Sequence, residues 1–405
     1  MGPIARNAVT FAEDDYDDVN ATYFADILRD RSWSALPAGW LNPESAACMT
    51  FPVVHPPQSE LQHYALDEGL ALSPWKTKLL DLLSHWEGRE MSYDEVSLSS
   101  SVTAANLCVL IALKQAGIRT LIFETPAYFS TLDQAQLLGF DVHRLPTYRR
   151  DGFELRPEQV SRAIAGKGRC ALFLTQPRFG IGSIQPLRHL LEIVDSLRPH
   201  DVLVIDEAAE QIRPSPTAGM PAGLPVIRTR GLFKGLGVNG LRISAILHPP
   251  KWRATIQRGL DPSGSSIDRY SLHNAVEMAG NLMLFDTLLQ QANRQVVESR
   301  RHIEIMALGT WVTPSPLEDS YIGSAFLDLR GLPGSYGEKR VALLEFCQSQ
   351  RMPVVLGASI GFALDEDFEA VRLNYFTSRQ NITKAMETLI AGHPELLARL
   401  SSPNR

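Results

Sequence analysis

The chain has 405 residues, of which 44% are hydrophobic and 21% are charged. This composition is typical of a globular protein, and the length is enough for two domains. The net charge of -6 argues against nucleic-acid binding, and no apolar stretch is long enough to span a bilayer. The four cysteines form no C-x-x-C pair and the ten histidines show no ligand spacing, so we expect neither a disulfide framework nor a metal site.

From residue 75 onward, apolar runs alternate with helical patterns. The apolar runs predict strands at 95–98, 120–123, 170–174, 202–205, 226–228 and 243–247. The helical patterns lie at 76–86, 103–115, 132–138, 157–165 and 187–197. Such alternation indicates an α/β fold with a mostly parallel sheet covered by helices on both faces. Sites in these sheets lie at the carboxyl ends of the strands.

A helical stretch from about 267 to 308 leads to a last segment with elements of its own. This segment shows strands at 324–329, 354–356 and 371–375, and helices at 337–350 and 379–390. We therefore expect three parts. Residues 1–45 form an N-terminal arm and part of a small domain, with a helix candidate at 20–31. Residues 46–300 form a large domain that carries the mostly parallel sheet and the site at its edge, and residues 301–405 form the small α+β domain.

A glycine-rich turn between two predicted strands places Lys234 eight residues before Arg242. Desolvation at a sheet edge favours the neutral form of a lysine amine, which can form an imine. An arginine held nearby can bind a phosphate through two parallel hydrogen bonds. An imine-forming lysine together with a phosphate-binding arginine is what pyridoxal phosphate (PLP) requires.

This turn has two other interpretations. A lysine beside glycines is most often a surface residue. Gly235, Gly237 and Gly240 also fit the G-x-G-x-x-G pattern of dinucleotide-binding proteins. That motif opens a helix directly after a strand, whereas a predicted strand at 243–247 follows these glycines. We therefore reject the dinucleotide interpretation.

From Tyr64 to Arg372 the chain resembles the class I and II aminotransferases, which are fold-type I PLP-dependent enzymes. The motifs occur in the family's order, at Tyr64 with Gly69-Leu70, Pro126-Ala127-Tyr128, 176–182, 202–207, 234–242 and 371–375. The resemblance implies the fold-type I PLP-transferase architecture, in which a large α/β domain carries a smaller α+β domain. It also implies a homodimer with shared sites.

The resemblance assigns roles at the cofactor ring. Lys234 would carry PLP as a Schiff base and move the catalytic proton. Asp206 would pair with the pyridinium nitrogen, although a helix N-cap is its plainer interpretation. Tyr128 would stack on the ring, and Gln176 stands where the family has the first asparagine of its loop.

Other residues would hold the phosphate and the substrate. Ser100, Ser101 and Val102 begin a helix whose N-terminus can receive the phosphate together with Arg242, although N-capping alone also selects serine there. Tyr64 would reach the phosphate of the neighbouring subunit. Arg372 would bind the α-carboxylate of the substrate, with a surface arginine as the alternative.

Three positions depart from the family. In the family, a second loop asparagine and a tyrosine both bond the phenolic oxygen of the cofactor. This chain has Phe179 and Ala209 at those two positions. Where the family has a serine or threonine that binds the phosphate, this chain has Gly231. Gln176 or Arg178 could substitute as the donor. These losses weaken the prediction of ordinary transamination more than that of PLP binding.

We predict an aminotransferase that acts on an L-α-amino acid, with a 2-oxo acid as the second substrate. The alternative is a PLP-dependent oxidase, cyclase, β/γ-elimination or replacement enzyme, or decarboxylase of a specialised biosynthetic pathway. The run of serines at 99–101 faintly resembles the PLP-dependent arginine oxidases. A PLP-fold regulator lacks support, since no winged-helix segment precedes the domain. We expect a cytoplasmic homodimer without nucleic-acid or membrane partners.

Overall fold

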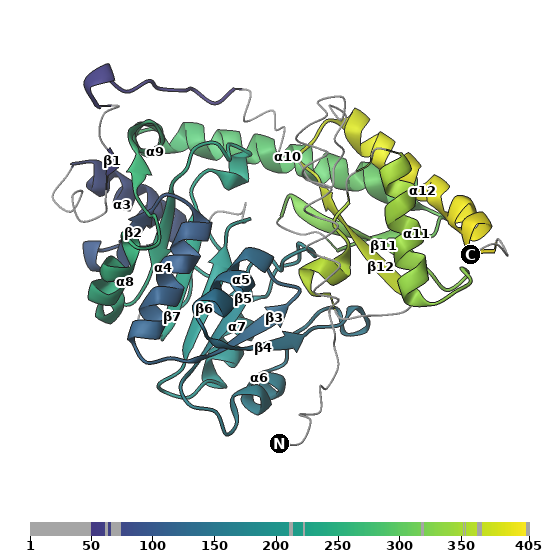
Figure 1. The fold of residues 1–405 in the computed structure, drawn as a ribbon. Coiled ribbons are helices and arrows are strands. Elements are labelled where there is room, and N and C mark those ends of the chain that lie inside the picture. Colours follow the sequence, from purple (N-terminus) through teal and green to yellow (C-terminus); the bar gives the residue numbers. More distant parts are fainter. Residues whose placement is uncertain are drawn as a thin grey trace.

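The structure, a computed structural model, describes residues 50–60, 64–65, 74–209, 214–221, 223–316, 320–350, 352, 354–362 and 367–401. The expected N-terminal arm and its helix candidate lie outside these residues. A large sheet and a small sheet dominate the described chain, and one long helix runs from the first to the second (Figure 1). No helix among the described residues is long and apolar enough to cross a membrane.

The large sheet has seven strands in the order β2-β8-β7-β6-β5-β3-β4. Their bounds are β2 Val96–Ser99, β3 Thr120–Thr125, β4 Asp141–Pro146, β5 Cys170–Thr175, β6 Val202–Glu207, β7 Val226–Gly231 and β8 Ser244–Leu247. The pairs from β4 to β7 are parallel, whereas β8 runs antiparallel to both β7 and β2. The predicted α/β fold with a mostly parallel sheet is therefore confirmed.

Helices cover both faces of this sheet because its buried strands are apolar on both sides. One face packs against α4 (Val102–Gln115), α5 (Phe129–Leu137) and α8 (Arg253–Leu260), and the other against α6 (Pro157–Ile164) and α7 (Leu187–Asp195). Successive strand residues point to opposite faces, so Phe123 joins the first core and Ile122 the second. Strand β4 escaped the sequence prediction because its residues at the sheet edge are polar and partly exposed.

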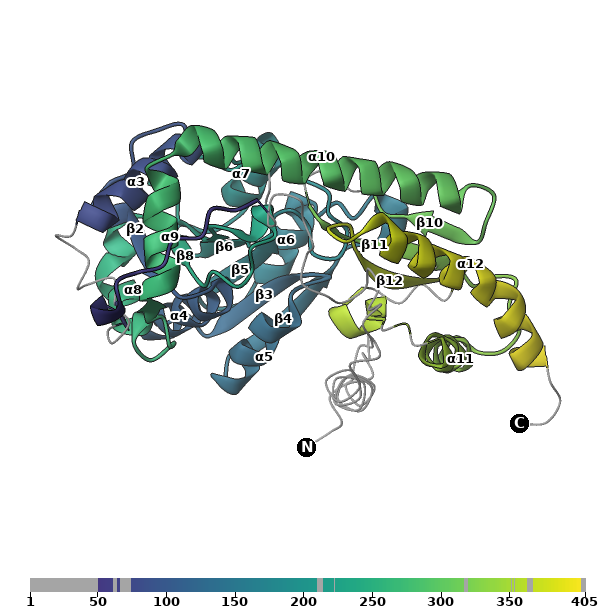
Figure 2. The ribbon, with the colours of Figure 1, turned by 90° about the horizontal axis from the view of Figure 1, so that it is seen from above.

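The helical stretch expected at 267–308 consists of two helices. Helix α9 (Arg269–Ala279) ends at Gly280, and α10 (Leu282–Ala307) begins after Asn281. The side chain of Asn281 accepts a hydrogen bond of 3.2 Å from the backbone N–H of Leu284, which caps the new helix. Helix α10 then runs across to the small sheet, as both views show (Figures 1 and 2).

The small sheet is antiparallel, in the order β10-β11-β12. It comprises β10 (Val312–Pro314), β11 (Ile322–Asp328) and β12 (Phe368–Asn374), with helices α11 (Tyr336–Ser349) and α12 (Arg379–Ser401). The strand predicted at 354–356 is wrong, since only a bridge from Leu356 to Val371 forms there. Helix α12 continues past the predicted end at 390. Helix α10 crosses residue 300, and the domain boundaries stay a prediction.

One apolar cluster joins the two sheets. Leu98 of β2, Phe285 of α10 and Leu327 of β11 belong to it, and each is at most 3% exposed. Burying a side chain of this size contributes about 1.5–3 kcal/mol. Helix α10 and this shared core therefore hold the small sheet beside the large one.

Candidate active site

A cavity of about 320 Å³ lies at the carboxyl ends of the parallel strands. The large-sheet side contributes Val102, Thr103, Tyr128, Phe129, Thr175, Pro177, Arg178, Phe179, Gly180, Asp206, Ala208, Ala209, Lys234 and Asn239. The small-sheet side contributes Ser320, Tyr321, Ile322, Arg372 and Asn374. The cavity therefore lies at the sheet edge where the sequence placed the site.

Lys234 lines this cavity just beyond the end of β7. It begins a single 3-10 turn, Lys234–Leu236, in which Lys234 O accepts from Gly237 N at 2.9 Å. Gly237 closes the turn with a φ of 75°, a left-handed conformation that suits glycine. Phe233 and Leu236 are buried in the core on either side of the lysine. The turn is thus anchored, and it holds Lys234 at the cavity with its side chain partly exposed.

Asp206 is the last residue but one of β6 and is 5% exposed. Its Oδ2 accepts from Asn106 Nδ2 at 2.8 Å, and its Oδ1 accepts from Ala208 N at 2.9 Å. Burial raises the pKa of the carboxyl, while Asn106 and the charge of Lys234 act against the rise. A cation next to Asp206 in the cavity would therefore keep this carboxylate ionised.

Asn106 was missed by the sequence analysis. It lies in the middle of α4, where Thr229 Oγ1 donates to its Oδ1 at 2.7 Å and its Nδ2 also reaches Thr131 Oγ1 at 3.1 Å. These contacts fix the side chain so that it donates to Asp206. The available signal was a polar residue inside an otherwise apolar helix, since buried polar groups need partners.

The start of α4 lies at the cavity as predicted, but its serines bond the protein. Ser101 caps the helix by accepting from Ala104 N at 3.1 Å, and Ser100 Oγ donates to Gly264 O at 2.9 Å. Val102 is buried against the cavity. The first N–H groups of a helix have no acceptor within it, so those of Val102 and Thr103 are suited to an anion.

Aromatic residues form part of the cavity wall. Tyr128 precedes α5, and its ring lies 5.0 Å from that of Phe129 and 5.8 Å from that of Phe179. Ala208 and Ala209 also line the cavity and leave room for a flat ring. Phe179 and Ala209 have no hydrogen-bond donor in their side chains.

Gln176 does not line the cavity. Its Nε2 donates to Gln185 O at 2.9 Å, and its Oε1 accepts from Gln185 N at 3.0 Å. The side chain is 1% exposed. The amide thus braces the loop after β5, and this geometry does not support the predicted contact between Gln176 and the cofactor.

One predicted phosphate-binding residue, Arg242, is absent from the described cavity wall of this chain. The side chain of Arg242 is exposed, and its backbone N–H donates to Ser271 Oγ at 2.8 Å. Tyr64 lies in β1 (Tyr64–Ala65), whose backbone pairs with Asp268 of β9 (Ile267–Asp268). The side chain of Tyr64 is not among the described parts of the structure.

Arg372 reaches the cavity from β12, next to Tyr321. Burial lowers the pKa of the guanidinium, while the nearby Tyr321 and Tyr128 act against this change. The Tyr321 ring stacks at 5.0 Å on the buried ring of Phe376. Arg372 therefore lies in the same cavity as Lys234 and Asp206, although it comes from the small sheet.

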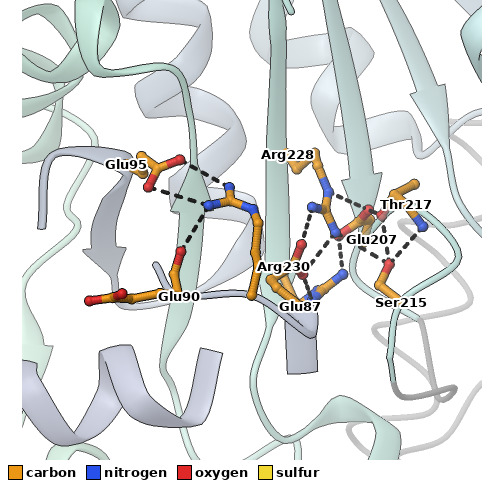
Figure 3. Close-up of polar contacts among 9 residues, drawn as sticks. Glu87, Glu90, Glu95, Glu207, Ser215, Thr217, Arg228 and Arg230 are labelled. Atoms are coloured by element: carbon orange, nitrogen blue, oxygen red, sulfur yellow. Dashed lines mark hydrogen bonds and ion pairs between the residues drawn. The ribbon is translucent and has the colours of Figure 1, made fainter. Parts of the chain in front are cut away.

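A buried ionic cluster lies behind this edge of the sheet (Figure 3). Arg228 and Arg230 of β7 bond Glu87 at the end of α3 (Pro74–Glu87) and Glu207 of β6. The Arg230 bonds measure 2.5 Å to Glu87 and 2.6 Å to Glu207. Burial acts to raise the pKa of Glu87, but the two guanidinium groups outweigh it and lower the pKa to about 2.

The cluster was absent from the sequence prediction, which ended the strand at residue 228. Side chains alternate along a strand, so Glu207 faces the cluster while Asp206 faces the cavity. In the same way Thr229 faces Asn106 between the two arginines. The cluster therefore fixes the register of the two strands that lead to Asp206 and Lys234.

Comparison with known proteins identifies the family. A family model described as aminotransferase class I and II matches residues 22–307, which is more than half of the chain. The chain belongs to the class I and II aminotransferase family. Members of this family are PLP-dependent enzymes.

Individual aminotransferases are similar to this chain to a lesser extent. A histidinol-phosphate aminotransferase of Haloferax volcanii is 30% identical over 118 residues, which cover 29% of this chain and 32% of that protein. This match therefore spans about a third of the relative. A double mutant of Thermus thermophilus aspartate aminotransferase has a TM-score of 0.73 at 20% identity, covering 97% of both chains. An aromatic aminotransferase of Pyrococcus horikoshii has a TM-score of 0.69 at 19% identity, covering 82% of this chain and 88% of that one. Both structural matches show a shared fold.

The cavity of this aminotransferase suits PLP. Asp206 is a buried carboxylate that a cation would keep ionised, and a protonated pyridine nitrogen is such a cation. Lys234 provides a primary amine on the same cavity. Tyr128 provides a flat face, and the start of α4 provides N–H groups for a phosphate.

Proposed function

We propose that this protein is an aminotransferase that acts on an L-α-amino acid, with Lys234 as the residue that holds the cofactor covalently. One observation carries the proposal. Lys234, Asp206 and Arg372 lie in separate parts of the sequence, and all three line one cavity. An amine, a buried carboxylate and a guanidinium are the groups needed for the cofactor carbonyl, the ring nitrogen and a substrate carboxylate.

When bound, PLP supplies an electron sink for negative charge at the substrate Cα. Asp206 would keep the ring nitrogen protonated, and Asn106 would hold that carboxylate in place. Nζ of Lys234 would accept the proton from Cα and return it, as general base and then general acid. Arg372 would bind the α-carboxylate in a bidentate pair, which orients Cα toward the lysine.

The phosphate would lie at the start of α4. The N–H groups of Val102 and Thr103 and the positive end of the helix dipole support this placement. Arg242 of the same chain is proposed to bind the phosphate, and Tyr64 of the neighbouring subunit to complete the site in a homodimer. Sedimentation tests the assembly, because a fully active monomer contradicts it.

A second candidate is a PLP reaction other than transamination. The observation that favours it is that Phe179 and Ala209 line the cavity without offering a donor. The negative charge on the phenolic oxygen of the cofactor would then lack the two hydrogen bonds that these positions supply in an ordinary aminotransferase. The reactions of this second candidate are oxidation, cyclisation, elimination, replacement and decarboxylation.

One experiment separates the two candidates. The purified protein is loaded with PLP and incubated with a panel of L-amino acids, with and without a 2-oxo acid, and products are identified by mass spectrometry. A keto product that forms only with the 2-oxo acid supports transamination. A product that forms without the 2-oxo acid supports the second candidate.

A further inference from the structure

Arg178 is a buried cation on the cavity wall that has no role in the proposed function, although the sequence names it beside Gln176 as a possible substitute donor. It lies in the loop after β5, and its side chain is 8% exposed. It lines the same cavity as Lys234 and Asp206. Burying a guanidinium is costly unless its N–H groups find acceptors.

Within the described chain, Arg178 has few such acceptors. Its Nη1 donates to Ser183 Oγ at 3.0 Å. Its Nε lies 3.8 Å from Glu124 Oε1, which is beyond hydrogen-bond distance, and this buried nitrogen has no other partner there. A guanidinium carries five N–H donors, so most of the donor capacity of Arg178 is unused.

Arg228 shows how the same protein satisfies a buried structural arginine. All three of its nitrogens donate, to Glu87, Glu207 and Ser215 (Figure 3). Arg178 has no comparable set of partners in the described residues. Because Arg178 also lines an open cavity, an acceptor on a ligand accounts for its placement better than a structural role does.

Glu124 does not fully neutralise Arg178. Its Oε1 accepts from Gln185 Nε2 at 2.9 Å. Burial raises the pKa of Glu124 to about 7, although Arg178, Gln185 and a backbone hydrogen bond from Thr175 act against the rise. Near neutral pH a substantial fraction of Glu124 is therefore protonated, and the loop keeps the positive charge of Arg178.

We propose that Arg178 donates a charge-assisted hydrogen bond to an anionic oxygen of the molecule bound in the cavity. Two oxygens have this chemistry, the phenolate of the cofactor and a carboxylate of the substrate. Phe179 and Ala209 on the same cavity cannot make such a bond. The inference rests on the proposed function, because it takes this cavity as the cofactor and substrate site.

The test compares three PLP-loaded proteins, namely the wild type, Arg178→Gln and the control Arg150→Gln. Arg150 is a matched arginine whose side chain is 78% exposed. Two properties are measured without turnover. They are the pH midpoint of the visible absorption band and the Kd of maleate, a dicarboxylate used as an unreactive probe. Loss of a charge-assisted hydrogen bond should change the affected equilibrium roughly tenfold to hundredfold.

Each outcome decides the proposal. A midpoint raised by about one pH unit or more in Arg178→Gln, with unchanged maleate binding, assigns the phenolate. A maleate Kd raised roughly tenfold or more, with an unchanged midpoint, assigns the substrate carboxylate. Both changes together assign both oxygens. If Arg178→Gln and Arg150→Gln both match the wild type in both measurements, the proposal is overturned.

Glu124→Gln decides the question if Arg178→Gln does not fold. This variant keeps Arg178 and removes the carboxylate that competes for it. At about pH 8, above the pKa of Glu124, it should bind maleate more tightly or show a lower midpoint than the wild type. No difference in either property overturns the proposal. If the protein binds PLP but does not transaminate, the proposed aminotransferase function is overturned. The two measurements need no turnover, so they still decide the role of Arg178.

Discussion

Asn106 donates a hydrogen bond of 2.8 Å to Asp206, although the two residues lie 100 positions apart. Asn106 lies in a helix that covers the sheet, and Asp206 lies near the end of a strand beneath it. The bond places a neutral donor against a buried carboxylate whose pKa is raised by burial. It favours the ionised form of Asp206 without supplying a charge that would compete with a ring nitrogen.

Replacing Asn106 by leucine should therefore weaken PLP binding. The carboxylate of Asp206 loses a hydrogen bond worth about 1.5–3 kcal/mol, which corresponds to roughly tenfold to hundredfold in the Kd of PLP. Fluorescence quenching of the apoprotein measures this Kd. Asn274→Leu is the matched control, since Asn274 is also buried but bonds Val54 away from the cavity. Equal losses in the two variants would show that Asn106 acts only through general stability.

The ionic cluster should make the protein sensitive to acid. The folded pKa of Glu87 is about 2, below its ordinary value of 4.5, so its contribution is present above about pH 4.5 and lost as the pH falls toward 2. Glu87→Gln should cost about 3–5 kcal/mol at neutral pH, because it leaves buried guanidinium groups without their partner. Urea unfolding at several pH values should show this difference shrinking below about pH 4.5.

Glu95→Gln is the control for this prediction. Glu95 pairs with Arg89, whose side chain is 38% exposed, and such surface pairs contribute about 0–1 kcal/mol. A cost at neutral pH as small for Glu87→Gln as for Glu95→Gln would mean that the cluster is energetically unimportant.

Gln176→Ala should lower the free energy of unfolding and leave the Kd of PLP unchanged. The change leaves N–H and C=O of Gln185 without their side-chain partner, at about 1–3 kcal/mol for a buried group. Urea unfolding and the Kd of PLP are measured together. The reverse result, normal stability with much weaker PLP binding, would restore the contact with the cofactor that the sequence predicted.

Runs of apolar residues made the large sheet predictable from the sequence. The runs at 120–123, 170–174 and 202–205 are apolar at every position except Thr120, because helices cover both faces. Asp206 and Lys234 follow such runs, and parallel strands bring their carboxyl ends to one edge. Strand β4 lacks this signal, since it is a polar edge strand. The break between α9 and α10 had a signal in Gly280-Asn281, which fits a helix end followed by a cap.

The supporting residues could not be predicted in this way. Arg228 ends the predicted strand at 226–228 and Arg230 lies in the turn expected after it, and nothing in the sequence marks either as buried, because their partners Glu87 and Glu207 are distant in the chain or on another strand. The same holds for Asn106 and for Glu124. A buried polar residue is recognisable only once its partner is placed, since burial without a partner would be too costly to occur.

Lys234 should be the residue that holds PLP. Borohydride reduction of the loaded protein, followed by peptide mapping, should find the cofactor on Lys234, and Lys234→Ala should abolish turnover because the proton carrier is lost. Lys76 is the instructive comparison. It is also buried, but its Nζ donates to Val96 O at 3.0 Å and lies above the ring of Tyr93, outside the cavity. A label on Lys76 or elsewhere would refute the assignment.

Phe179→Asn should change the cofactor environment in a defined direction. Phe179 lines the cavity and offers no donor, whereas an asparagine amide could bond the phenolic oxygen. A hydrogen bond to a charged group is worth about 1.5–3 kcal/mol, and 1.36 kcal/mol is one pH unit, so the midpoint of the visible band should fall by on the order of one unit. Phe179→Leu is the control, since it removes the ring without adding a donor.

The double variant Phe179→Asn with Arg178→Gln extends this prediction. If Arg178 bonds the phenolate in the wild type, the asparagine should lower the midpoint by more in the Arg178→Gln background, where it is the new donor, than in the wild type. An equal shift in both backgrounds would mean that Arg178 acts on a substrate carboxylate instead. If Phe179→Asn titrates like Phe179→Leu, position 179 does not reach the phenolic oxygen. The loss of the family's asparagine would then no longer argue for a reaction other than transamination.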